Sequence, residues 1–354
     1  MKVAIVGLPK SGKSTVFTAV TGLTVDPFAP PQAHQGVVRV PDPRLHYLTE
    51  LYKPKKVTQA VIEFTDIPGC SLSDAHGRDA WKQLLPTVRL AEALVAVVRD
   101  FKNDAVPAYR DRIDAQSDFD EVWAELIFAD LDAVTTRIER IEKAVKKPTG
   151  SQDAQKHEMA LLQRCKEALE SDAPLSSVLH SESDRAAVSS FSFLTQKPII
   201  CVRNVSDDAV ATAAPVQAKH SAGSISLSAS IEAEIAALEP ADRAAFLADL
   251  GLQAPAKDRL VQTCYQAMGL ISFLTMGEDE VRAWTITKGS TAVEAAGKIH
   301  SDLARGFVRA ETIAYDDLVA HKDSKGAKAA GKARKEGKTY IVADGDILNI
   351  LSST

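Results

Sequence analysis

The stretch GLPKSGKST, Gly7–Thr15, decides the fold of this chain. It matches the pattern G-x-x-x-x-G-K-[ST] and directly follows the apolar run VAIV at 3–6. In such a loop the glycines let backbone N–H groups turn inward around a β-phosphate, Lys13 reaches the β- and γ-phosphates, and the Ser14 hydroxyl ligates Mg²⁺. A helix expected from roughly Lys13 to Val20 aims its positive dipole end at the same phosphates. The sequence therefore predicts a nucleotide-binding loop that comprises Leu8, Pro9, Lys10, Ser11, Gly12, Lys13, Ser14 and Thr15.

Four later strand-like runs carry polar motifs at their carboxyl ends. The first ends in a D-x-x-G, in which Asp66 can hold Mg²⁺ through a water and the Gly69 N–H can sense a γ-phosphate. Motifs at the carboxyl ends of strands are typical of an open, mostly parallel α/β sheet that binds its ligand at that edge. The runs are AVIEFTDIPG (60–69), ALVAVVRDF (93–101), KPIICVRNVSDD (197–208) and SISLSAS (224–230).

The last two runs end in residues that a switch NTPase uses to read its base. Asn204 offers a carbonyl and an amide, so it can serve adenine, which has an N6 donor beside an N1 acceptor. Val205 lacks the long stem that a GTPase lysine lays along the base, whereas the Asp207 carboxylate suits the adjacent N–H donors of guanine. With Ser228 and Ala229 on the next strand end, this set predicts that ATP binds at least as well as GTP.

A helical insertion interrupts the sheet from about Phe119. Its apolar residues follow the spacing of a coiled-coil seam at Ile127, Leu131, Val134, Ile138, Ile141 and Val145. The stretch PTGSQD, 148–153, breaks the helix, and a second run continues through Met159, Leu162, Cys165 and Leu169. We expect an antiparallel hairpin of about 60 residues. Its narrow apolar stripe favours a protruding arm over an extra layer on the sheet.

The chain changes character after 253–257. The short β-rich runs ISFLTMG, VRAWTI and YIVADGDILNIL, with the helix TAVEAAGKIHSDLARG between them, predict a small α+β domain. Within it, His321–Lys338 carries seven Lys or Arg against two acids. That segment could bind RNA through phosphates, and a solvated flexible loop explains the charge equally well.

Composition restricts the class of protein. The 354 residues carry a formal charge of −5, which argues against a protein that coats nucleic acid with its whole surface. The four cysteines show no C-x-x-C spacing, which suits a reducing compartment and argues against a zinc site. No apolar run approaches the roughly 18 residues that span a bilayer. We expect a cytoplasmic protein of several domains that does not enter the membrane.

Several stretches resemble the Obg-like ATPases of the YchF type, in the order found in that family. The resemblance implies a P-loop NTPase domain in two parts (1–115 and 185–267), a coiled-coil insertion (116–184) and a C-terminal ubiquitin-like TGS domain (268–354). It also implies Mg²⁺-dependent hydrolysis of ATP in preference to GTP, and association with the ribosome through its large subunit. The stretches are GLPKSGKST, RVPDPRLHYLTELYKPKKV, FTDIPG, ELIFADLDAVTTRIERIEK, ASIEAEIAALEPADRAAFLADLG and EVRAWTITKGSTAVEAAGKIHSDLARGFVRAE.

Four positions depart from the family pattern. Pro30 stands where the family has a threonine that can ligate Mg²⁺, and Asp207 replaces a glutamate. Lys10 and Ser11 stand where the family has Asn-Val. In related cation-dependent NTPases that asparagine helps to hold K⁺, so the Lys10 ammonium could supply this charge covalently as a second catalytic group beside Lys13. An ordinary solvent-facing loop lysine is the alternative.

Three functions remain open at this point. The leading hypothesis is an ATP-hydrolysing switch that acts on the ribosome. The second is a nucleotide-binding module that docks on ribosome or RNA with little or no hydrolysis, which the loss of the threonine at Pro30 favours. A small-molecule kinase is the third, and it leaves the base-reading strand ends unexplained.

Overall fold

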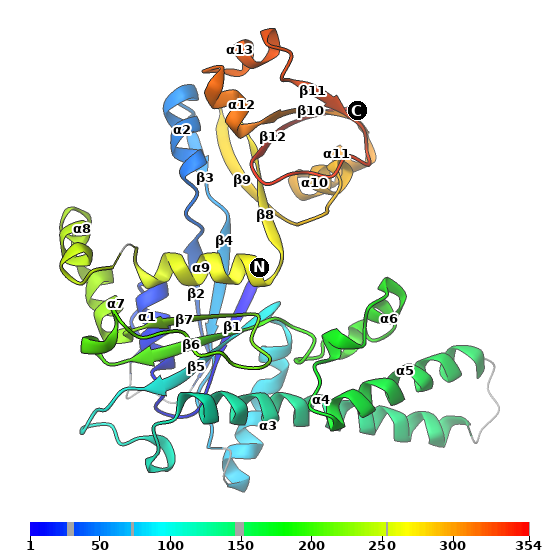
Figure 1. Cartoon of the computed structure of the whole chain (residues 1–354). Coiled ribbons are helices and arrows are strands. Elements are labelled where there is room, and N and C mark those ends of the chain that lie inside the picture. Colours follow the sequence, from blue (N-terminus) through cyan, green and yellow to red (C-terminus); the bar gives the residue numbers. More distant parts are fainter. Residues whose placement is uncertain (27–31, 72–73, 146–151, 253, 354) are drawn as a thin grey trace. The chain divides into compact units, whose positions relative to one another are not determined.

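The computed structural model of the protein describes residues 1–26, 32–71, 74–145, 152–252 and 254–353 (Figure 1). It divides into two compact units. The first comprises Met1–Val37 and Glu63–Thr263, and the second comprises Val38–Ile62 and Cys264–Thr354. Within the described ranges, no helix has the length and apolar character needed to cross a membrane.

The first unit is built on a six-stranded sheet of order β2-β4-β1-β5-β6-β7. The strands β4, β1, β5, β6 and β7 pair in parallel, which confirms the predicted sheet. Strand β2, whose buried residues alternate with exposed ones from Gly36 onward, was not predicted. The strands are β1 (Lys2–Val6), β2 (His34–Arg39), β4 (Val61–Asp66), β5 (Ala93–Asp100), β6 (Ile199–Val205) and β7 (Gly223–Leu227).

Helices follow most of these strands. The α-helices are α1 (Lys13–Thr21), α3 (Ala75–Arg89), α4 (Ala115–Val145), α5 (Gln152–Glu170), α6 (Glu182–Ala187), α7 (Ala229–Ala237), α8 (Pro240–Asp249) and α9 (Ala256–Ala267). Short 3₁₀ turns occur at Tyr109–Asp111, Leu175–Ser177, Ser189–Phe191 and Asp207–Ala209.

The helical insertion is both a packing layer and an arm. The first part of α4 shares one core with the sheet, since Phe119 and Leu126 cluster with Leu94 of β5. Farther along, α4 and α5 lie side by side and extend beyond the sheet (Figure 1). Both alternatives considered from the sequence therefore hold, each for one part of the helix.

Two details of this insertion differ from the prediction. Helix α4 begins four residues before Phe119, after Asp114, whose carboxylate accepts the Ser117 N–H at 3.0 Å as an N-terminal cap. Helix α5 begins at Gln152, inside the stretch 148–153 that was expected to break the helix. Residues 148–151 and the Val145 side chain lie outside what the structure describes.

The second unit has its own six-stranded sheet, of order β11-β10-β12-β8-β9-β3. Two of the predicted β-rich runs form strands β8 and β9, which pair antiparallel. The helix expected over 291–306 is broken at His300, whose extended backbone (φ −163°) separates two helices. The elements are α2 (Pro43–Tyr52), β3 (Lys56–Thr58), β8 (Leu270–Thr275), β9 (Glu280–Thr287), α10 (Ala292–Ile299), α11 (Ser301–Arg305), β10 (Phe307–Ala314), α12 (Tyr315–Ala320), α13 (Ser324–Ala329), β11 (Arg334–Glu336) and β12 (Asp346–Ser352).

Residues 38–62 group with the second unit, although we predicted them within the first part of the P-loop domain. Strand β3 pairs in parallel with β9 through Lys56↔Glu280 and Thr58↔Arg282. The Arg44 guanidinium forms an ion pair with Asp344 at 3.0 Å. A three-residue strand carries too little pattern to reveal such a long-range pairing in the sequence.

The basic segment 321–338 is ordered as α13 and β11, so it is not a structureless loop. Three of its cations are held within the unit: Lys328 by Glu311 (2.9 Å), Lys332 by Asp317 (3.1 Å) and Arg334 by Glu336 (3.6 Å). Within the described residues the other four form no ion pair: Lys322, Lys325, Lys335 and Lys338.

Candidate functional site

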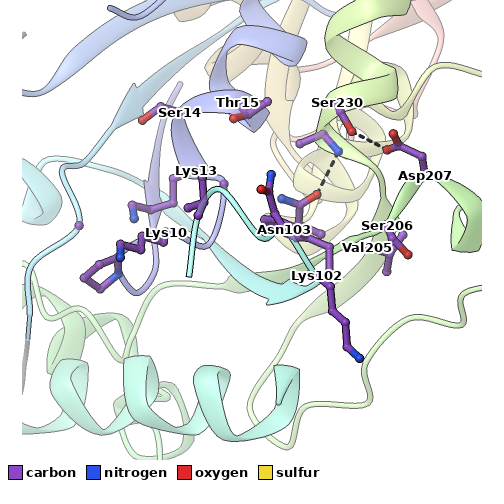
Figure 2. Close-up of a pocket in the computed structure, with 17 residues that line it drawn as sticks. Lys10, Lys13, Ser14, Thr15, Lys102, Asn103, Val205, Ser206, Asp207 and Ser230 are labelled. Atoms are coloured by element: carbon purple, nitrogen blue, oxygen red, sulfur yellow. Dashed lines mark hydrogen bonds between the residues drawn. The ribbon is translucent and has the colours of Figure 1, made fainter. Parts of the chain in front are cut away.

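A cavity of about 590 Å³ opens at the carboxyl edge of the parallel sheet (Figure 2). This volume is typical of small-molecule sites. Figure 2 shows Lys10 and Lys13 toward one end of the cavity, and Asp207 and Ser230 toward the other. The lining residues are Pro9, Lys10, Gly12, Lys13, Ser14, Thr15, Gly69, Phe101, Lys102, Asn103, Val106, Asn204, Val205, Ser206, Asp207, Ala229 and Ser230.

The loop between β1 and α1 has a backbone that requires glycine. Gly7 and Gly12 have φ angles of 149° and 92°. A Cβ on Gly12 would also come within 2.2 Å of the Asn204 amide nitrogen. Helix α1 begins at Lys13 without a side-chain cap, so the N–H groups of its first turn are available to an anion.

Lys13 is the buried cation of this loop, with 6% of its surface exposed. Its Nζ donates a hydrogen bond to the Leu8 carbonyl at 2.9 Å. Burial lowers the pKa of Lys13 from 10.5 to about 8, while the nearby Asp66 and Cys70 act in the opposite direction. The protein alone does not offset the cost of burying the Lys13 ammonium, so an anionic ligand would stabilise its charged form.

Ser14 and Asp66 form a pair of oxygen ligands beside Lys13. The Ser14 hydroxyl donates to Asp66 Oδ2 at 2.6 Å, and the buried Asp66 Oδ1 has no hydrogen-bond partner among the described residues. Burial raises the pKa of Asp66, although Ser14, Lys13 and His34 favour its charged form. A hydroxyl and a carboxylate are the hard oxygen donors that Mg²⁺ prefers, so this pair fits that ion.

In the described part of the chain, no group of three or more His, Cys, Asp or Glu side chains could hold a metal ion.

The Asn204 side chain lines the cavity and also connects two parts of its wall. Its Oδ1 accepts the Ala229 N–H at 3.0 Å, and its Nδ2 donates to the Ser11 carbonyl at 3.1 Å. The side chain is 4% exposed. Asn204 therefore ties the loop before α1 to the start of α7, and the Ala229 N–H already has an acceptor within the protein.

Arg99 is a positioning residue that the sequence analysis missed. This buried side chain of β5 donates to three carbonyls: those of Lys10 (3.1 Å), Phe101 (3.1 Å) and Val106 (2.7 Å). Its guanidinium also lies 4.3 Å from the centroid of the Phe101 ring. One side chain thus fixes both the loop before α1 and the segment 101–106, which forms another wall of the cavity.

The structure brings the predicted residues to one place. Leu8, Ser11, Asp66 and Ser228 lie behind the cavity wall and contact lining residues or their backbone; the others line it. Lys10 is exposed, has a φ of 63°, and its ammonium has no partner among the described residues. Pro30 lies outside the described residues.

Some lining residues were not predicted. Phe101, Lys102, Asn103 and Val106 follow β5, and the only signal for them was their place after the carboxyl end of a buried strand. Ser206 and Ser230 lie inside motifs whose neighbours were chosen instead.

Comparisons with known proteins agree with this geometry. Residues 2–130 match the family model of 50S ribosome-binding GTPases, and residues 270–352 match the model YchF-GTPase_C, described as a protein of unknown function. The ribosome-binding ATPase YchF of Bacillus subtilis is 42% identical over 98% of this chain and 97% of its own length. The protein of the same name from Escherichia coli O157:H7 is 39% identical over 99% and 98%. The solved YchF GTPase of Schizosaccharomyces pombe has a TM-score of 0.83 at 29% identity, covering 99% of this chain and 97% of that one.

Proposed function

The chain belongs to the YchF family, and from that premise we propose that it is a cytoplasmic switch that binds ATP, hydrolyses it slowly and associates with the ribosome. The observation that carries the proposal is the phosphate end of the cavity. There a buried lysine with a lowered pKa lies beside a Ser–Asp pair with a free buried oxygen. Both features fit a Mg²⁺–triphosphate.

Each residue at this end has a role in hydrolysis. Lys13 would contact the β- and γ-phosphates, and Ser14 and Asp66 would hold Mg²⁺, which would neutralise charge on the phosphates. The N–H groups of the first turn of α1 and of Gly69 donate to phosphate oxygens. Water would attack the γ-phosphorus as the bond to the β–γ bridging oxygen breaks, the proton lost by the water would pass to an oxygen of the released phosphate, and ADP and phosphate would leave.

We assign Lys10 a second catalytic role. It lines the cavity, is exposed, and its ammonium has no partner among the residues that the structure describes. A positioned cation at that end of the cavity offsets the negative charge that develops between the β- and γ-phosphates.

ATP is the favoured nucleotide, with GTP second. The Ala229 N–H, a donor that could reach a guanine O6, is bound by Asn204. Phe101 and Val205 offer apolar surface to a base, and Val205 has no charged head to recognise guanine.

The partner is the ribosome, and we propose its large subunit. Two curated relatives are named ribosome-binding ATPases, and the model that matches residues 2–130 is that of a 50S ribosome-binding GTPase. The four lysines that form no ion pair with the described residues (Lys322, Lys325, Lys335 and Lys338) supply an RNA-facing surface on the C-terminal unit. Replacing all four by glutamine should weaken co-sedimentation with 50S subunits and flatten its salt dependence. Unchanged co-sedimentation would move the contact to the helical arm or the sheet.

A docking module with little or no hydrolysis is the second candidate, because a proline cannot supply the hydroxyl that the family pattern has at position 30. Steady-state phosphate release from ATP, with and without ribosomes, separates the two, with Lys13→Ala as the inactive control. Release above that control supports the switch. Tight ATP binding with release equal to the control supports the docking module, and no ATP binding by the wild type overturns both.

A further inference from the structure

Two hydroxyl groups converge on one oxygen of the base-end carboxylate. The Oγ atoms of Ser228 and Ser230 each lie 2.5 Å from Oδ1 of Asp207, and 2.9 Å from each other. Ser230 and Asp207 both line the cavity, and Figure 2 shows the contact between them at its wall. Oδ2 of Asp207 has no such contact with either serine.

These contacts fill Oδ1. A carboxylate oxygen has about two lone-pair sites for hydrogen bonds. Each hydroxyl has a single proton, and the charged oxygen is both the nearer and the stronger acceptor, so both protons point to Oδ1 rather than to the other serine. Oδ2 is then the oxygen left for a ligand.

A half-filled carboxylate discriminates between bases. Guanine presents N1–H and N2–H₂ side by side, a pair that both oxygens of a carboxylate accept together. Adenine presents one donor, N6–H₂, next to the N1 acceptor, and one free oxygen is enough for it. Asp207 can therefore accept only one of the two hydrogen bonds that guanine offers, whereas it can accept the one that adenine offers.

The two serines differ in what they do. Ser228 is fully buried, caps α7 by accepting the Ile231 N–H at 3.3 Å, and alone would leave one lone pair on Oδ1 for a base. Ser230 lies at the cavity wall, and its hydroxyl removes that last site. We propose that Ser230 determines base specificity, because its hydroxyl occupies the last hydrogen-bonding site on Oδ1 of Asp207 and so denies that site to guanine. This inference rests on the proposed nucleotide-binding function.

The test is the ratio of GTP to ATP affinity, measured by competition against a fluorescent ATP analogue on the full chain. Ser230→Ala should raise that ratio about tenfold, because a hydrogen bond to a charged acceptor becomes available to guanine. Ser230→Thr keeps the hydroxyl and should keep the wild-type ratio. Ser206→Ala is the matched control. It removes a hydroxyl from the same cavity but leaves both serine hydrogen bonds to Asp207 in place. Since Ser230 is exposed on a helix and alanine is a better helix former, the variant will fold.

The outcomes are distinct. A raised ratio in Ser230→Ala alone supports the inference. An unchanged ratio, an equal rise in Ser206→Ala, or a tenfold GTP preference already present in the wild type overturns it and leaves the proposed function in place. Failure of the wild type to bind either nucleotide overturns the proposed function, and the inference with it.

Discussion

Replacing Lys13 by methionine should stabilise the nucleotide-free protein while abolishing its nucleotide binding. The ammonium is buried, and burial lowers the pKa of Lys13 from 10.5 to about 8. At about 1.4 kcal/mol per pKa unit, the charged form destabilises the fold by about 3 kcal/mol. Methionine has a similar length and no charge, but it leaves the Leu8 carbonyl without its donor. We therefore expect the free energy of unfolding at pH 7 to rise by about 1–3 kcal/mol.

The stability gained by replacing Lys13 depends on pH. Below pH 8 the lysine is protonated in both the folded and the unfolded chain, so the wild type carries the whole penalty. Between about 8 and 10.5 the unfolded chain binds the extra proton, and the stability of the wild type rises with pH. The advantage of Lys13→Met should thus be greatest below pH 8 and vanish near pH 10.5. Over the same range, ATP binding by the wild type should weaken, because phosphate needs the charged form.

Urea unfolding of nucleotide-stripped protein at several pH values between 7 and 10 measures this difference. Lys102→Met is the matched control, because Lys102 lines the same cavity but is exposed. Its replacement should change stability by less than about 0.5 kcal/mol. A less stable Lys13→Met variant, or an advantage that does not depend on pH, would refute the reasoning. So would ATP binding by that variant at wild-type strength.

Three shorter predictions concern the rest of the cavity. Asp66→Asn should lower ATP affinity at least about tenfold in the presence of Mg²⁺ and much less in EDTA, as titration in both buffers will show. Arg99→Lys keeps the charge but cannot reach all three carbonyls of its loop contacts, so isothermal titration should show ATP affinity reduced by about tenfold. If Lys10 supplies the catalytic cation, phosphate release should be equal in Na⁺ and K⁺ buffers of the same ionic strength, and should become K⁺-dependent in Lys10→Asn; a K⁺ requirement in the wild type contradicts that role.

The sequence revealed the parts of the fold that local patterns encode. Buried strands such as β5 are continuous apolar runs, and the loop at Gly7–Thr15 requires glycine at set positions, so both could be recognised without a structure. The seam of α4 followed from side-chain spacing, and Ile127, Val134 and Ile141 are indeed buried. These features depend on neighbours along the chain.

The missed features depend on residues distant in the sequence. In the sequence, Arg99 is a charged residue within an apolar strand. Its hydrogen bond to the Lys10 carbonyl joins residues 89 positions apart and forms only in the folded chain. Strand β3 joins the second unit through a partner more than two hundred residues away. The two serine hydrogen bonds to Asp207 join residues from separate sequence motifs. They depend on side-chain rotamers, which the spacing of residues in the sequence does not reveal.

The two ends of the cavity differ in how far the protein itself satisfies their polar groups. At the base end, the Asn204 amide and Oδ1 of Asp207 have their hydrogen bonds within the protein, and Oδ2 of Asp207 is left for the base. At the phosphate end, burial disfavours the charged form of both Lys13 and Asp66, and the buried Asp66 Oδ1 and Ser11 Oγ lack partners among the described residues. An anion alone would stabilise Lys13 but repel the Asp66 carboxylate, and a metal ion alone would do the reverse. A ligand that carries both charges in a fixed arrangement, as a metal–triphosphate does, stabilises both groups at once. The same folding that makes the base end rigid therefore leaves a site at the other end that is complete only when nucleotide and metal bind together.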